Sequence, residues 1–203
     1  VARDKIFLLF IGAVILNKVI FGNIDFYLPV HLSDSFKTTT IFGFEIYGQR
    51  MLTIFVMLNT LIIIFSMTFV NQLTNKWSER KSLTTGALLQ GLGFAAAFLM
   101  NSFIPLILAS IVMTIGEMIL VPSSQSLRAD LMNEEKIGTY SGFVTITDPI
   151  GSVLSGSLVS FSVYIHHTGV AVVMVVVTVL LVLCFNQVMK MKTQAEIASS
   201  KNT

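Results

Sequence analysis

The chain has 203 residues, of which 54% are hydrophobic and only 12% are charged, and its mean hydropathy is +0.80. Soluble domains carry about 25% charged residues, so this composition excludes an ordinary cytosolic protein, and its apolar content excludes a disordered one. A single cysteine excludes a disulfide framework, and the net charge of +2 comes from dispersed residues that form no basic face for nucleic acid. We therefore expect a polytopic membrane protein that needs no metal or cofactor and has no nucleic-acid partner.

Six stretches are long and apolar enough to be spanning helices, each of which needs about 20 mostly apolar residues. They lie at residues 6–32, 48–72, 83–100, 103–125, 138–165 and 168–189. A loop rich in Ser and Thr follows the first stretch, basic and acidic loops flank the third and fourth, and a pair of histidines closes the fifth. The tail at 190–203 is polar, and we expect it to be frayed. These features predict an all-α bundle of six helices.

The distribution of Lys and Arg predicts the orientation of this bundle. With six spans, the side that holds both termini carries ten of these residues, whereas the other side carries only Lys37 and Arg50. Because cytoplasmic loops are enriched in Lys and Arg, both termini are predicted to be cytoplasmic. The chain begins with Val1 and shows no signal peptide, so we expect it to be a fragment with a segment missing upstream.

The six spans also divide into two groups of three near residue 101. Since three is odd, the two groups have opposite orientations, which is the arrangement of the inverted repeats of secondary transporters. The third and sixth spans have no ionisable residue in their cores, so we expect these two to face lipid. The charges lie in the other spans, where a cavity is expected.

Glu117 is the strongest candidate for a functional residue, because it lies near the middle of the fourth span. A charge at mid-bilayer costs about 3 kcal/mol and therefore usually faces a cavity or a partner. Helical spacing places Met113, Thr114 and Ser124 on the same face, and Pro122 can loosen the helix there. Burial disfavours the charged form of a carboxyl group, which suits the loading and release of a proton. The alternative is a neutral carboxyl that is hydrogen-bonded to a neighbouring helix.

Asp25 and Lys18 are the ionisable residues within the first span. Asp25 is interpreted either as a cavity-facing carboxylate that binds protons or cations, or as an interfacial acid at a helix end. Lys18 precedes it by seven residues, which places both on one helical face about 10 Å apart. This separation argues against a tight ion pair within the helix and leaves an interhelical arrangement open. Lys18 is either a structural counter-charge, a snorkelling residue or part of a cavity lining.

Asp148 belongs to a polar stripe in the fifth span. The stripe has the helical spacing of one face and consists of Ser141, Thr145, Asp148, Ser152 and Ser155. It is interpreted as a cavity lining or as a polar seam between helices. His166 and His167 are expected to be loop residues, because no third metal ligand is apparent. The sequence has no phosphate loop, nucleophile elbow or HExxH motif, so we do not expect an enzyme.

Several segments of the chain form a recognisable pattern: Asp25–Ser33, Ser35–Thr38, Gly43–Ile54, Gly116–Glu117, Pro122–Ser123, Ala129–Asn133 and Glu135–Gly138. With these segments the chain resembles, over nearly its whole length, the carboxy-terminal half of the lactococcal-type multidrug/proton antiporters of the major facilitator superfamily. The resemblance implies helices seven to twelve of a twelve-helix transporter that lacks its amino-terminal half here. It also implies efflux of amphiphilic, often cationic drugs in exchange for protons, with the carboxylates of Asp25 and Glu117 serving proton coupling and drug binding.

The chain departs from the pattern of these antiporters at three positions. Lys18 and Asp148 are not expected there, and Thr178 stands where a carboxylate is expected in the last helix. These departures leave the predicted fold unchanged. The resemblance and the charges within the spans together predict a proton-coupled drug antiporter that works by alternating access, with Asp25 and Glu117 as the coupling and binding residues. Two alternatives remain: a carrier for an endogenous nutrient or lipid that uses the same cavity, and a half-transporter scaffold that transports nothing.

Overall fold

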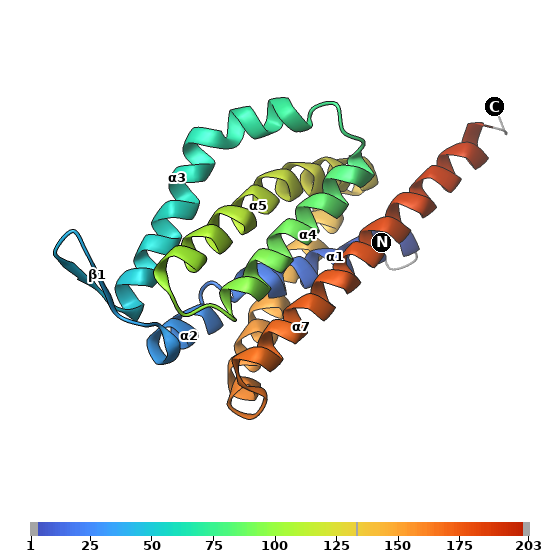
Figure 1. Ribbon diagram of the computed structural model, residues 1–203. Coiled ribbons are helices and arrows are strands. Elements are labelled where there is room, and N and C mark those ends of the chain that lie inside the picture. The colour runs from blue at the N-terminus through green and yellow to red at the C-terminus, as the bar shows by residue number, and fades with distance from the viewer. Residues whose placement is uncertain (1–3, 133, 201–203) are drawn as a thin grey trace.

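The computed structural model describes residues 4–132 and 134–200, and this part of the chain is helical apart from one short hairpin. Its helices are α1 (Lys5–Gly22), α2 (Tyr27–Ser35), α3 (Gly48–Thr74), α4 (Glu79–Ala97), α5 (Phe103–Leu131), a 3-10 helix at Glu134–Lys136, α6 (Ile137–Thr145) and α7 (Thr147–Ser200) (Figure 1). The all-α prediction is confirmed for this architecture. The polar loop expected after the first span contains the antiparallel strands β1 (Thr39–Ile41) and β2 (Phe44–Ile46).

The hairpin forms because Phe42 and Gly43 both adopt positive φ angles, of 51° and 81°. Two such residues between paired strands are typical of the tight turns that match the strand twist. The hairpin extends away from the helices in Figure 1.

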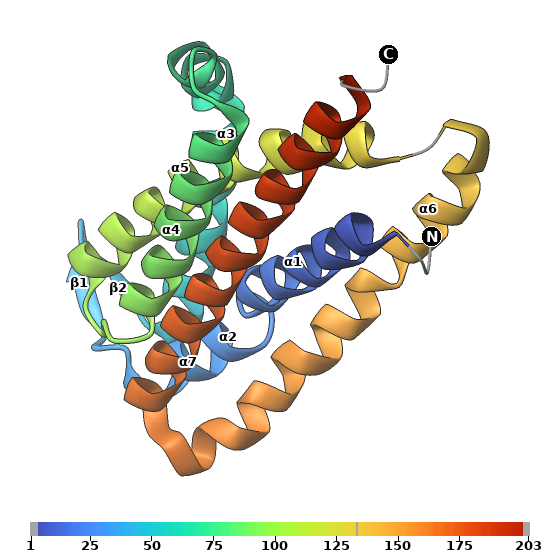
Figure 2. The same cartoon turned by 90° about the vertical axis from the view of Figure 1, so that its right-hand side faces the viewer.

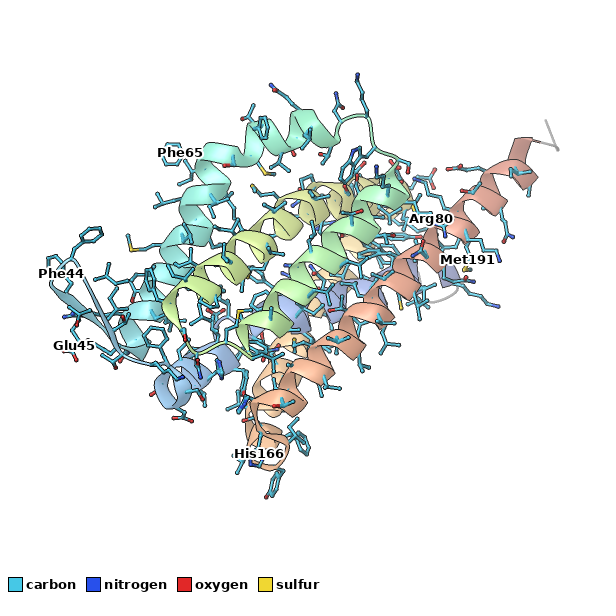
Figure 3. The ribbon with its side chains drawn as sticks, viewed as in Figure 1. Phe44, Glu45, Phe65, Arg80, His166 and Met191 are labelled. Atoms are coloured by element: carbon cyan, nitrogen blue, oxygen red, sulfur yellow. The ribbon has the colours of Figure 1, made fainter. Side chains whose placement is uncertain are left out.

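Helix α7 folds back on itself at His166, whose φ of 58° and ψ of 174° are not helical. We call residues 147–165 its first arm and residues 167–200 its second arm; Figure 3 labels His166 at the turn between them. The break falls where the histidine pair was expected to close the fifth span. The second arm remains helical through Ser200, so the expectation of a frayed tail is wrong up to that residue.

Four helical stretches of the described residues are long and apolar enough to cross a membrane. They are Lys5–Ser35, Gly48–Thr74, Phe103–Leu131 and Ile137–Ala198, the last of which includes both arms of α7. α4, which corresponds to the expected third span at 83–100, is not among them. The first stretch is interrupted at residues 23–26, where Asn23 donates a side-chain hydrogen bond of 2.7 Å back to the Val19 carbonyl at the end of α1.

α4 lies at the centre of the bundle, between α5 and the second arm of α7, while α1 packs on the first arm and α3 packs on α5 (Figure 2). Small side chains make this possible, since Gly86, Ala87, Gly91 and Gly93 are all buried on α4. A side chain at Gly91 would overlap Thr178 on α7. The expectation that the third span faces lipid is therefore wrong for most of the surface of α4.

α4 and α5 approach each other unusually closely. A Cβ atom placed on Gly93 would lie 2.7 Å from the Met113 Cβ and backbone nitrogen, and one on Gly86 would lie 2.7 Å from the Leu120 nitrogen. Gly116 of α5 meets the α4 backbone in the same way. This interface consists of backbone against backbone, so it fixes which face of α5 turns away from α4.

Both ends of the described chain lie at one end of the bundle. Near the carboxyl end, Lys192 forms ion pairs with Asp130 at 2.6 Å and with Glu79 at 3.2 Å. Near the amino end, the Tyr140 hydroxyl donates to Asp4 at 3.1 Å. Figure 3 shows Arg80 and Met191 close together in this region, and Phe65 on the outer side of the bend of α3.

The opposite end of the bundle is held together by contacts between α2 and the turn that joins α4 to α5. The His31 imidazole donates through Nε2 to the Met100 carbonyl at 2.9 Å. The backbone nitrogen of Lys37 donates to the Asn101 carbonyl at 2.8 Å. The hairpin and the turn of α7 at His166 lie at this end as well (Figure 1).

Candidate functional site

Glu117 lies at the midpoint of α5, fourteen residues from each end of Phe103–Leu131, which corresponds to about 21 Å of helix on either side. Its carboxylate Oε2 accepts a hydrogen bond of 2.9 Å from the Asn59 side chain on α3. The same amide nitrogen donates to the Thr114 hydroxyl at 3.0 Å, and Thr114 in turn donates to the Ser110 carbonyl at 2.7 Å. We call Asn59, Thr114 and Glu117 the Glu117 cluster.

The close interface between α4 and α5 explains why Glu117 points toward α3. Gly116, the preceding residue, is pressed against the backbone of Gln90 on α4. Consecutive residues of a helix are rotated by about 100°, so Glu117 turns away from α4. Asn59 is 93% buried and meets it from α3. The sequence left open that the Glu117 carboxyl group is hydrogen-bonded to a neighbouring helix, and its contact with Asn59 on α3 is a hydrogen bond of this kind.

Glu117 has an amide donor but no cationic partner in the described part of the chain. The ion pairs found there join Lys18 to Asp148 and Lys192 to Glu79 and Asp130. A carboxyl group at this depth is costly when charged and unpaired. The arrangement can therefore hold a proton or attract a cation, and the two compete for the same oxygen atoms.

Asp25 lies apart from this cluster, in the turn between α1 and α2, and its side chain is exposed. Because α1 ends at Gly22, Asp25 does not continue the helical face that carries Lys18, and the expectation of a shared face is wrong. Within residues 4–132 and 134–200, no ion pair or hydrogen bond joins Asp25 to Glu117. The structure does not bring the two predicted coupling carboxylates into contact.

Lys18 is paired instead with Asp148 on α7, at 2.6 Å. A Cβ on Gly151 would meet the Lys18 Cβ, and the Ser155 hydroxyl donates to the Val19 carbonyl at 3.1 Å. Small residues thus let α1 and the first arm of α7 approach closely. The polar stripe of the fifth span was interpreted as a seam between helices or as a cavity lining. Ser155 lies in a seam between α1 and α7, whereas Asp148 lines a pocket.

The remaining residues predicted to line a cavity are placed differently. Thr145 and Ser152 are exposed on the bundle surface. Met113 is fully buried against α4, so it packs in the core. Thr114 belongs to the Glu117 cluster, and Ser124 lines a pocket together with Lys18 and Asp148.

Sequence reasoning missed Asn59, which is the only side chain described here as donating to Glu117. The available signal was an amide within an otherwise apolar span, since such groups are costly in lipid and usually find a polar partner. Sequence reasoning also left the Lys18–Asp148 pair open, because no pattern states which helices are neighbours.

A carboxylate at the midpoint of a spanning helix, hydrogen-bonded across to a second helix, is typical of membrane proteins that move ions or small molecules. The sequence model of the Major Facilitator Superfamily matches residues 1–200, and the chain belongs to this family of membrane transporters. It is therefore not an enzyme. The resemblance noted in the sequence is confirmed at the level of the superfamily.

Two similar proteins fit this assignment. Over 160 residues the chain is 27% identical to a Na(+), Li(+), K(+)/H(+) antiporter of Planococcus maritimus, and the match covers 76% of this chain and 38% of the antiporter. The fold is similar to a crystal structure of a POT family transporter in complex with a thioalcohol-conjugated peptide, with a TM-score of 0.72 and 16% identity over 94% of this chain and 41% of that one. The chain spans about two fifths of the length of each.

Proposed function

We propose that the chain is the carboxy-terminal half of a proton-coupled antiporter that exports amphiphilic cations by alternating access. In this proposal it comprises six spans in a 3+3 inverted repeat, with the boundary near residue 101. The first three spans are α1 with α2, α3 and α4, and the last three are α5, α6 with the first arm of α7, and the second arm. An amino-terminal half of six helices supplies the other wall of the cavity.

Both termini are cytoplasmic in this proposal, because the end of the bundle that holds them carries most of the Lys and Arg residues. Lys5, Lys76, Lys136 and Lys190 all belong to that end. This distribution supports the orientation through the enrichment of basic residues in cytoplasmic segments.

The observation that carries the proposal is a mid-span carboxylate that has an amide donor and, among the described residues, no cationic partner. A cation bound beside Glu117 is released when the carboxyl group takes up a proton from outside, because protonation removes the attraction. The protonated protein then turns inward and releases the proton. Coupling requires that proton and substrate stabilise the two conformations differently. Asp25, in its exposed turn, serves in this scheme to attract protons and cations to the outer mouth.

A second candidate, the exchange of alkali cations for protons, is suggested by the name of the Planococcus relative. Ions of this kind are bound by sets of oxygen atoms that replace their hydration shell. The Glu117 cluster offers a carboxylate and one hydroxyl, while the Asn59 amide presents N–H to both. Such a small set of oxygen atoms favours an organic cation, which binds with less complete removal of water.

The test is efflux of a fluorescent cationic dye, driven by a proton gradient, from vesicles that contain the full transporter of which this chain is the carboxy-terminal half. Glu117→Gln keeps the shape of the side chain and removes its charge, so dye efflux driven by the gradient falls to background. Glu45→Gln, in the exposed hairpin, is the matched control and keeps the parental rate. Gradient-driven efflux that survives in Glu117→Gln contradicts the proposed coupling site.

The same vesicles distinguish the alternatives. A Na⁺- or K⁺-dependent proton flux without dye movement assigns the second candidate. Saturation by one compact substrate assigns a nutrient or lipid carrier. If substitutions of Asp25 and Glu117 change only the assembly of the protein, the chain is a scaffold.

A further inference from the structure

A pocket of about 220 Å³ lies between α1, α5 and the break that separates α6 from α7. α5 contains Pro122 next to this pocket, and Ile146 interrupts the helix on the other side. A larger hollow of about 510 Å³ shares Gln125 and Arg128 with it and is also lined by Ala129, Met132 and Ile137, where α5 ends and α6 begins. The pocket is separate from the Glu117 cluster, none of whose residues lines it.

Arg128 is the most informative residue of this pocket. It is half-buried, yet in the described ranges it takes part in none of the ion pairs and donates no hydrogen bond. A guanidinium group has five N–H donors in a planar fork that matches a carboxylate, and it keeps its charge at every physiological pH. An arginine left unpaired in a pocket is therefore suited to an anionic oxygen ligand.

The other polar groups of the pocket define which anion fits. Lys18 is paired with Asp148, so the three ionisable residues of the lining sum to a single positive charge. The Asn17 side-chain oxygen is buried and has no hydrogen-bond partner. One net positive charge favours a monoanion over a dianion, and the Asn17 oxygen can accept a hydrogen bond from any donor that the body of the ligand carries.

All three elements also contribute apolar side chains to the lining, beside the uncharged polar groups of Ser124, Gln125 and Thr147. The apolar wall is formed by Phe10, Val14, Val121 and Val144. Such a wall favours a ligand whose polar group is attached to a hydrophobic body, as in small-molecule sites generally. We propose that this pocket binds a small monocarboxylate with an apolar body, whose carboxylate is held by Arg128 and neighbours the Lys18–Asp148 pair. This class of ligand differs from the cation proposed for Glu117, and the inference does not depend on that proposal.

The test uses the full protein that contains this chain, in phosphatidylcholine nanodiscs, with 4-fluorobenzoate as the probe, observed by fluorine NMR. We expect saturable binding that benzoate displaces and that the uncharged benzamide does not. Arg128→Gln weakens binding by about tenfold or more, because a bidentate, charge-assisted contact is lost. Lys76→Gln removes one exposed positive charge from the same end of the bundle and leaves the affinity unchanged.

A substitution that removes a negative charge instead of a positive one distinguishes an effect on ligand binding from an effect on folding. Asp148→Asn removes a negative charge from the pocket and releases Lys18, so it strengthens carboxylate binding severalfold. A merely structural role for these residues predicts weaker binding in both variants, with loss of helical circular dichroism. Glu117→Gln leaves the affinity for 4-fluorobenzoate unchanged, which keeps this test distinct from that of the antiporter.

Three results overturn the inference. The first is equal binding to the parent and to Arg128→Gln. The second is absence of saturable binding in the parent. The third concerns the lipid: 4-fluorobenzoate binds to the protein in phosphatidylcholine nanodiscs, but no longer binds when the nanodiscs contain phosphatidylglycerol, because this lipid occupies Arg128. That result assigns the pocket to an anionic lipid headgroup.

Discussion

Replacing Gly93 with alanine tests the close approach of α4 and α5. The added methyl group would lie 2.7 Å from the Met113 Cβ and backbone nitrogen, whereas ordinary contacts begin at 3.4 Å. The helices must therefore separate by about 0.7 Å along this contact, and backbone atoms cannot relieve the overlap by changing a rotamer. Overpacking of this kind typically costs about 1–3 kcal/mol, and the higher helix propensity of alanine offsets about 0.8–1.0 kcal/mol of that cost. We expect the free energy of unfolding to fall by up to about 2 kcal/mol.

The assay is unfolding of the purified chain in mixed micelles, followed by circular dichroism. Gly12→Ala is the matched control, because Gly12 lies within α1 and has no atom within 4 Å of an added Cβ. Alanine is a better helix former than glycine by about 0.8–1.0 kcal/mol, so this variant is stabilised. If both substitutions shift the unfolding free energy in the same direction, α4 and α5 are not in backbone contact, and the account of how Glu117 is oriented fails.

Three further predictions concern the site and the turns. Asn59→Leu removes the hydrogen bond that favours the charged carboxylate of Glu117, and it lowers the affinity for a transported cation about tenfold; an unchanged KM for dye efflux contradicts this role. In a double-mutant cycle with Lys18→Leu and Asp148→Leu, the coupling free energy of unfolding is at most about 1 kcal/mol, because both side chains are partly exposed; a value of several kcal/mol refutes that estimate. His166→Gly relieves the positive φ of 58° at the turn of α7 and raises the unfolding free energy by about 1 kcal/mol; a lower melting temperature counts against strain there.

The positions of most helices in this chain can be predicted from the apolar stretches and from the polar loops that separate them. The helix predicted at 48–72 is observed at Gly48–Thr74, and the one predicted at 103–125 extends to Leu131. Helix ends depend on capping, which hydropathy does not register. α4 begins at Glu79 because the Ser78 side chain accepts a hydrogen bond from the Lys81 nitrogen, four residues before the apolar stretch starts.

Some residues of the candidate site can be predicted from a single helix, whereas others can be found only from the packing of helices against each other. Glu117 was identified from its own depth in an apolar span. Its partner Asn59 is 58 positions away in the sequence, and the pairing of Lys18 with Asp148 crosses 130 positions. Contacts at such distances depend on which helices are neighbours, and that follows from small residues at interfaces rather than from the spacing of polar ones.

The composition of α4 has a consequence for how the protein is made. Insertion into the bilayer is judged largely on the hydrophobicity of individual segments as they emerge from the ribosome, and α4 is not among the four stretches that qualify by hydropathy. Its buried surface includes Ser82, Gln90 and several glycines, which suits contact with protein more than contact with acyl chains. α4 is thus expected to enter the membrane late, once α5 and the second arm of α7 have been synthesised and can shield it, so early truncation of the chain would strand this segment outside the bilayer.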